Sequence, residues 1–174
     1  MNYQFDIALS FATENEALVE SVYHYLKAEE IKVFFAPSQE GQMILSGKNQ
    51  QEIFYSIFGM NADYVALFIS KDYISKKTPM DEARIAFAKK GNLGKVIPIY
   101  LDETELPRDL FDPKNTNYFK SADPAVIASH LAGKIEASKR GGETSEIPNC
   151  GMNIIGNKSD KQFFIQTMEG NINL

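Results

Sequence analysis

The segment YVALFIS, Tyr64 to Ser70, is an almost continuous apolar run with the length of one β-strand. Similar runs occur elsewhere in the chain: FDIALSF (Phe5 to Phe11), KVFF (Lys32 to Phe35), KVIPIYL (Lys95 to Leu101) and the weaker NYF (Asn117 to Phe119). Strands that are apolar on both faces are typical of parallel sheets whose two faces are both covered. We therefore predict a buried parallel sheet.

Amphipathic helices are predicted between these strands. Apolar residues spaced three and four apart predict a helix from about Glu14 to Glu29, and shorter stripes predict helices around Ile53 to Phe58, from Thr78 onward and after Asp123-Pro124. Alternating strands and helices are typical of α/β folds, so we expect a flavodoxin-like five-stranded sheet of order 2-1-3-4-5 with helices on both faces. In this fold, ligands bind at the carboxyl ends of the first and third strands, where the strand order reverses.

The chain is expected to form one domain followed by a tail. Its 174 residues, 44% of them hydrophobic, suffice for one core, which we place in residues 1–138. Residues 139–150 are charged and contain glycine and proline, so they are predicted to be a linker. Residues 151–174 hold three short β-type runs, MNIIG, QFFIQT and INL, and are predicted to be a β-rich tail that promotes oligomerisation or docking.

The composition excludes several classes of function. The net charge is −5 and no segment gathers basic residues, so nucleic acid is not an expected partner. The apolar runs are too short to span a bilayer and the N-terminus lacks a signal peptide, so we expect no membrane association and a cytoplasmic location. Cys150 is the only cysteine, and His24 and His130 lie on separate helical patterns, so no metal site or cofactor is expected, and His130 is interpreted as structural.

Two familiar sites of this fold do not match the predicted crevice. Its walls would be Ser10, Phe11 and Ala12 after the first strand and Ser70 after the third. A phosphate-accepting receiver domain needs carboxylates at these strand ends, which the sequence does not supply. A flavin site needs a loop rich in glycine or hydroxyl groups after the first strand, and SFATENEA contains no glycine.

Two adjacent acids follow the third strand in the segment SKKTPMDEARIAF. Thr78-Pro79-Met80-Asp81 is interpreted as an N-cap and a capping box, which gives Asp81 a structural role. Glu82 lies about 100° further round the helix. It could simply interact with the positive end of the helix dipole, which is worth about 0.3–1 kcal/mol. The helix nevertheless begins beside the crevice, so a role for Glu82 in the site stays open.

Four ordered segments resemble one known family. The chain from FDIALSF through KVFF is similar to the family's first strand, helix and second strand, and LSGKNQQEIF is similar to the loop that follows. YVALFISKDYISKKTPMDEARIAFAKK is the strongest match, because Ser70, Tyr73 and Glu82 fall on the family's pattern, and KVIPIYLDETELP resembles the fourth strand and its exit loop. From about Phe5 to Ile135 the sequence resembles the Toll/interleukin receptor (TIR) domains, in particular the soluble bacterial ones.

The resemblance implies an activity and a site. The implied reaction cleaves the nicotinamide–ribose bond of NAD+, which is a substrate and not a cofactor, to give nicotinamide and ADP-ribose or a cyclic or variant ADP-ribose signal. Glu82 is the implied catalytic residue. Thr78 replaces an aromatic of the family pattern, and Gly47 and Lys48 lie in a long segment that suits a movable lid. The expected substrate-binding residues are Ser10, Phe11, Ala12, Gly47, Lys48, Ser70, Tyr73 and Thr78.

The resemblance also implies partners. Activity is expected to depend on a homo-oligomer formed through TIR–TIR contacts, with a role in bacterial antiphage immunity and a possible effector or sensor protein. Met43, Ile44 and Leu45 are expected to form an exposed apolar trio in the lid. The alternative is an adaptor without catalytic activity that acts through TIR–TIR association. Glu82 favours the enzyme, whereas Thr78 in place of an aromatic favours the adaptor.

Overall fold

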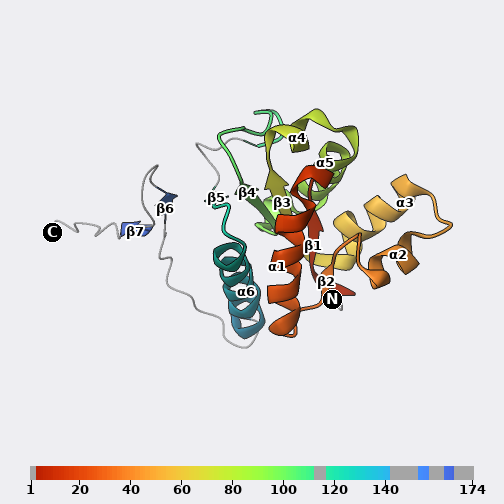
Figure 1. Cartoon of the computed structure of the whole chain (residues 1–174), viewed down its shortest axis with the longest axis horizontal. Helices are drawn as coiled ribbons and strands as arrows, with labels where there is room; N and C mark the ends of the chain where they lie inside the picture. The colour runs from red at the N-terminus through yellow and green to blue at the C-terminus, as the bar shows by residue number, and fades with distance from the viewer. Residues whose placement is uncertain (1–2, 112–116, 142–152, 157–162, 167–174) are drawn as a thin grey trace.

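The computed structural model describes residues 3–111, 117–141, 153–156 and 163–166. Five parallel strands form one sheet in the order β2-β1-β3-β4-β5, which confirms the predicted topology (Figure 1). The strands are β1 (Phe5–Ser10), β2 (Val33–Phe34), β3 (Ala62–Ile69), β4 (Val96–Tyr100) and β5 (Phe119–Lys120).

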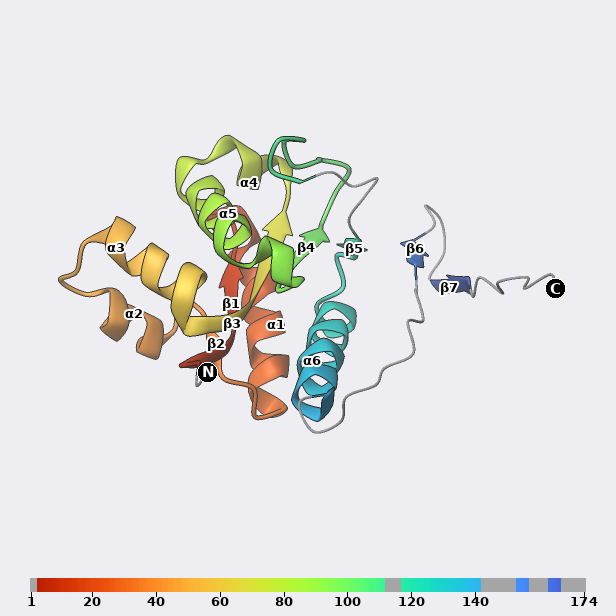
Figure 2. The ribbon, with the colours of Figure 1, turned by 180° about the vertical axis from the view of Figure 1, so that it is seen from behind.

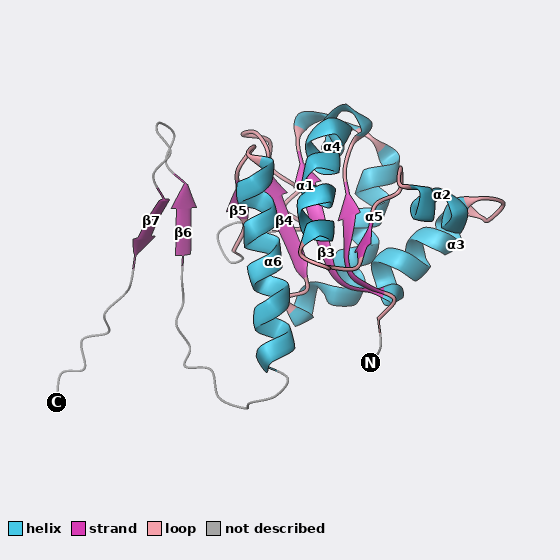
Figure 3. Cartoon of the chain, turned by 60° about the horizontal axis from the view of Figure 1, so that its bottom comes forward, coloured by secondary structure: helices cyan, strands magenta, loops and turns pink. Residues whose placement is uncertain are grey.

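Helices cover both faces of the sheet, so the strands form the middle layer (Figure 3). On one face lie α1 (Glu16–Ala28) and α6 (Pro124–Gly141), which pack against each other (Figure 1). On the other face lies α5 (Lys77–Lys90), in front in Figure 2. Residues of α3 (Gln50–Phe54), the π-helical η2 (Tyr55–Asn61) and α4 (Lys71–Ser75) pack in the same core as α5. The remaining helical segments of the sheet domain are η1 (Thr13–Asn15), α2 (Gln39–Leu45) and η3 (Gly91–Leu93).

β3 is the middle strand of the sheet, and its side chains contribute to the hydrophobic cores on both faces. Ala66 and Phe68 face the core under α1 and α6, whereas Leu67 and Ile69 face the core under α5. This alternation follows from the two-residue period of a strand, and it explains why the sequence of β3 shows no polar side. The same period places Ser10 of β1, which pairs with Leu67, on the α5 side.

Two local predictions about helices were wrong. The third predicted helix was to begin with Thr78 as N-cap, but α5 begins at Lys77, and its N-cap Lys76 makes no side-chain cap bond. The segment before Asn49 was expected to be a loop, but it contains α2, whose N-cap Ser38 accepts a hydrogen bond from Gly41 N.

The tail is described in two short strands. β6 (Asn153–Gly156) pairs antiparallel with β7 (Phe163–Gln166), in the regions where MNIIG and QFFIQT predicted strands. The INL run lies outside the described residues, and so does most of the predicted linker, although α6 continues to Gly141. In the described part of the chain, no helix combines the length and the apolar character needed to cross a membrane.

Gly41 is required where α2 approaches the end of β2. A Cβ atom on Gly41 would lie 2.3 Å from Phe35 O and 2.7 Å from Ala36 O, which are rigid backbone atoms. Gly133 in α6 has open space around the same position. The two glycines therefore form a matched pair for testing the packing of α2.

We predict that Gly41→Ala lowers the free energy of unfolding by roughly 1–3 kcal/mol, because the backbone must move to admit the methyl group. Gly133→Ala should instead raise it by about 0.5–1 kcal/mol, since alanine is the better helix former. Urea denaturation of the two variants tests this. Equal effects would show that α2 is not packed as described.

Candidate active site

At the predicted crevice, Ser10 is the last residue of β1 and Ser70 directly follows β3. Ser10 is only 1% exposed and Ser70 is 4% exposed. Ser70 Oγ accepts a hydrogen bond from Tyr73 N at 3.2 Å and so caps α4. This cap turns the chain back over the sheet directly after β3, and it directs the side chain of Tyr73 into the core.

Tyr73 is completely buried beneath the crevice. Its hydroxyl donates a hydrogen bond to Pro79 O at 2.9 Å and lies 2.8 Å from Ser10 Oγ. Burial raises the pKa of Tyr73 well above its ordinary value, and the nearby Glu82 charge raises it further. Tyr73 is therefore a neutral hydroxyl group that joins β1 to the start of α5.

Glu82 faces the sheet from α5. Neighbouring residues of the same helix face, Met80, Ala83 and Ala86, are buried in the core, and they hold the Glu82 side chain at 8% exposure. Ser10 Oγ donates to Glu82 Oε2 at 2.5 Å when the carboxylate is ionised. Burial raises the pKa of Glu82 from 4.5 to about 8, the Ser10 hydrogen bond opposes this shift, and the Asp81 charge adds to it.

Asp81 does not have the role predicted for it. Because α5 begins at Lys77, Asp81 is not part of a capping box, and it forms an ion pair with Arg84 at 3.2 Å instead. The prediction took Pro79 as the first helical residue, where its missing N–H costs nothing. Proline is tolerated at the third position as well, because the N–H groups of the whole first turn lack partners within the helix.

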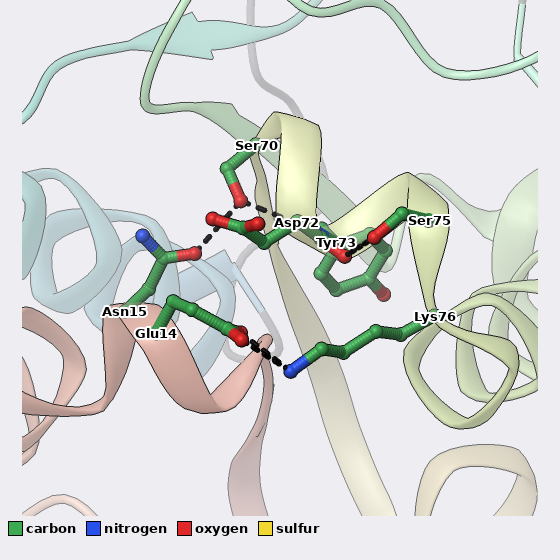
Figure 4. A network of polar contacts seen from close by, with 7 residues as sticks. All are labelled: Glu14, Asn15, Ser70, Asp72, Tyr73, Ser75 and Lys76. Carbon is green, nitrogen blue, oxygen red and sulfur yellow. Dashed lines mark hydrogen bonds and ion pairs between the residues drawn. The ribbon is translucent and has the colours of Figure 1, made fainter.

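A second layer of contacts crosses the crevice between η1 and the segment around α4 (Figure 4). Ser70 Oγ donates to Asn15 Oδ1 at 2.8 Å, and Lys76 Nζ forms an ion pair with Glu14 at 2.6 Å. The Lys76 partner lowers the pKa of Glu14. The sequence interpretation missed Asn15, Glu14 and Lys76, since only the folded chain shows that η1 and α4 are neighbours.

The structure brings together only part of the predicted site. Ser10, Ser70, Tyr73 and Glu82 are linked by hydrogen bonds. Ala12 is buried in the same core as Tyr73.

Phe11 faces the other side of the sheet. Its ring stacks on Phe35 at 5.4 Å between centroids and packs against the core under α1. Phe11 therefore has a packing role in this form of the protein.

The predicted lid residues are exposed. Gly47, with φ of 73°, and Lys48 lie in the turn between α2 and α3. The prediction of an exposed apolar trio was wrong for Ile44 and Leu45, because both are partly buried against the core under α5. Met43 is 73% exposed.

Thr78 belongs to a different opening from Glu82. It is exposed and lines a cavity of about 520 Å³ between α5 and the α3–η2 segment, together with Asp81, Arg84 and Tyr55. Glu82 does not line this cavity. Adjacent acids on α5 thus face different surroundings, as the rotation of about 100° per residue requires.

His130 has the structural role expected of it. Its ring stacks on Phe119 at 4.1 Å between centroids, and burial lowers its pKa. Within the described ranges, no three His, Cys, Asp or Glu side chains are arranged to hold a metal ion.

Comparisons with known proteins connect this geometry to a family. A family model described as the TIR domain matches residues 7–129, which include the whole hydrogen-bonded group around Glu82. The chain is 36% identical over 109 residues to the 3' cyclic ADP-D-ribose synthase AaTIR of Aquimarina amphilecti. That match covers 61% of this chain and 32% of the relative, so the chain spans about a third of the relative's length.

Solved structures of low sequence identity share the fold. The TIR domain of the Toll-related receptor TRR-2 from Hydra magnipapillata has a TM-score of 0.60 at 18% identity, with 76% of this chain and 98% of that chain covered. A metazoan TIR-STING receptor from C. gigas, solved with 2',3'-cGAMP, has a TM-score of 0.59 at 12% identity. This match covers 78% of this chain and 40% of the receptor chain.

The buried Glu82 should make stability depend on pH. Its pKa is about 8 in the folded protein against an ordinary 4.5, so between these values the folded state binds one more proton than the unfolded state. The free energy of unfolding should therefore fall as pH rises through this window, by at most about 1.4 kcal/mol per pH unit. The stability that Glu82 contributes by binding this proton is complete below pH 4.5 and is lost above about pH 8.

Glu82→Gln should remove this dependence, because glutamine keeps the shape and does not titrate. We expect the variant to be more stable than the unaltered protein at pH 8 and the difference to shrink towards pH 5. Urea denaturation across this range measures it. A difference that does not vary with pH would show that the pKa of Glu82 is not raised.

Proposed function

Because this chain belongs to the TIR domain family, we propose that it is an NAD+ nucleosidase that cleaves the nicotinamide–ribose bond with Glu82 as its catalytic residue. The products would be nicotinamide and ADP-ribose or a cyclic or variant ADP-ribose. The 36% identical relative is described as a 3' cyclic ADP-D-ribose synthase, which supports this class of reaction.

One observation carries the proposal: a buried carboxyl group lies where this fold binds ligands. Ser10 ends β1 and Ser70 directly follows β3, on the two sides of the point where the strand order reverses, and Glu82 contacts Ser10. Other buried polar side chains of the described residues are few, and Lys90 lies at the far end of α5. An ionised carboxylate without a cation is costly to bury, and carboxyl groups whose pKa is strongly raised are concentrated at functional sites.

The chemistry explains how one carboxylate can suffice. Glycoside hydrolysis commonly needs an acid to protonate the leaving oxygen and a second carboxylate to support the sugar cation. The nicotinamide ring of NAD+ is cationic, so it leaves as a neutral molecule when it takes the electron pair of the broken C–N bond. Ionised Glu82 would bind the ribose hydroxyls and stabilise the positive charge that develops on the sugar.

The site must open before NAD+ can reach Glu82. Ser10 and Glu82 are buried, and the contacts of Ser70 with Asn15 and of Lys76 with Glu14 join the two sides of the crevice. We propose that self-association opens it, with the exposed Met43 on α2 at the contact between copies. Opening would place Ser10, Ala12, Ser70 and Tyr73 beside the substrate, with Gly47, Lys48 and Thr78 at its edge. A role in bacterial antiphage immunity, a cytoplasmic location and an effector or sensor partner stay predictions.

The adaptor is the alternative function. The 8% exposure of Glu82 favours it, since little of this residue is accessible in this form of the protein. An adaptor would assemble through its surface and release no nicotinamide in any state of assembly. The two functions therefore differ in one measurement.

We predict that the purified protein releases nicotinamide from NAD+ at concentrations that favour assembly, and that Glu82→Gln lowers this rate by at least about 10²-fold because the charge is lost. Asp81→Asn is the matched control. It removes the neighbouring acid and its ion pair with Arg84, and it should leave turnover largely intact. Chromatographic measurement of nicotinamide gives the rates. Equal rates for Glu82→Gln and the unaltered protein would refute the mechanism, and no release in assembled protein would favour the adaptor.

A charge at Met43 should weaken assembly and activity together. Met43→Glu places a carboxylate on an exposed surface of α2, so the fold of the monomer should be unaffected. Light scattering and nicotinamide release, measured over the same concentration range, should both shift to higher protein concentration. Glu40→Gln, which changes charge on the same helix, is the control. Full specific activity from a strictly monomeric Met43→Glu protein would contradict the role of assembly.

A further inference from the structure

Four oxygen atoms form a continuous row beneath the crevice. Glu82 Oε2 lies 2.5 Å from Ser10 Oγ, Ser10 Oγ lies 2.8 Å from Tyr73 Oη, and Tyr73 Oη lies 2.9 Å from Pro79 O. Each distance is that of a hydrogen bond, so each contact needs a hydrogen atom between its two oxygens. The row therefore needs three hydrogens.

The hydroxyl groups supply two of these hydrogens. Ser10 and Tyr73 each carry one, and the carbonyl of Pro79 carries none. If Glu82 were ionised, one contact would place two oxygens together with no hydrogen between them, in a buried position where water cannot relieve the repulsion. A protonated Glu82 supplies the third hydrogen, and the bonds then run in one direction, from Glu82 to Ser10, to Tyr73 and to Pro79.

Among the residues that the structure describes, no neighbouring charged group compensates for the hydrogen that the row lacks when Glu82 is ionised. The titratable groups that act on it are Tyr73 from α4 and Asp81 from α5, and Asp81 is paired with Arg84. The core on this side of the sheet contributes apolar side chains: Val65, Leu67 and Ile69 of β3, Ile57 and Phe58 of η2, and Met80 and Ala83 of α5. No cation of the described residues forms an ion pair with Glu82.

We propose that Ser10 and Tyr73 are positioning residues that hold Glu82 as a neutral acid in the closed protein, and that Glu82 releases this proton to solvent when the crevice opens. The closed form is then inactive for a chemical reason as well as a steric one, because a neutral carboxyl group cannot stabilise a sugar cation. The catalytic part of this statement rests on the proposed function. The protonation of the closed form does not.

Tyr73→Phe tests whether the row needs a proton from Glu82, because the titration midpoint of Glu82 should then shift in a defined direction. Without the tyrosine hydroxyl, only the contact between Ser10 and Glu82 remains, and one hydrogen satisfies it whether Glu82 is neutral or ionised. The neutral form of Glu82 is then no longer needed to complete the hydrogen bonds. The titration midpoint of Glu82 should therefore fall by about one pH unit or more. If instead Tyr73 supports donation by Ser10 to an ionised Glu82, the midpoint should rise.

The midpoint can be measured by NMR on the carboxyl carbon of Glu82, assigned by its absence from Glu82→Gln. Tyr64→Phe removes a hydroxyl from a buried tyrosine on the opposite face of the sheet and should leave the midpoint unchanged. A midpoint that rises or stays constant in Tyr73→Phe overturns the proposal. This measurement needs no NAD+, so it separates a failure here from a failure of the proposed reaction.

Infrared spectroscopy of the unaltered protein gives a second test if Tyr73→Phe does not fold. At pH 6, a neutral Glu82 should show a carboxylic acid C=O band that is absent from Glu82→Gln. The band should disappear as the pH rises above about 8, where Glu82 ionises. Absence of the band at pH 6 overturns the proposal.

Discussion

The parallel pairing of β1 with β3 is the constraint on which the rest of the molecule depends. It joins residues that are far apart in the sequence, Phe5 with Ala62 and Ser10 with Leu67, and it places the ends of the two strands side by side. The chain turns outward after each end, to one face after β1 and to the other after β3. A crevice must therefore form at this point, and the side chains that follow each strand become its walls.

The same pairing explains why a carboxyl group can be buried at low cost. Ser10 reaches Glu82 only because the two-residue period of β1 directs it to the α5 face, and Tyr73 reaches Ser10 only because Ser70 caps α4. A protonated carboxyl group with a hydrogen-bond partner needs much less compensation than an isolated charge in the core. In the proposed mechanism, the neutral form of Glu82 suits the folded core and the ionised form suits catalysis.

The sequence was sufficient to predict the sheet, but it was insufficient to predict the contacts that form the walls of the candidate site. Strand order and the positions of Ser10, Ser70 and Glu82 at one edge followed from apolar runs, helical periodicity and the family pattern. The helix start at Lys77 did not follow, because proline is compatible with several positions of a first turn. Ile44 and Leu45 were misjudged because the polar residues around them gave no sign that α2 packs on the core. Contacts such as that of Asn15 with Ser70 could not be predicted, because nothing in the sequence indicates that these two segments lie side by side.

The last backbone pair between β1 and β3 is Ser10 with Leu67, and the contacts described beyond it are made by side chains. Separation of η1 from α4 would then break no hydrogen bond of the sheet ladder. Such a local opening costs less free energy than global unfolding, because the sheet and both cores stay formed. Residues such as Glu14 and Lys76 therefore set how readily this part of the chain separates while the sheet beneath it stays paired.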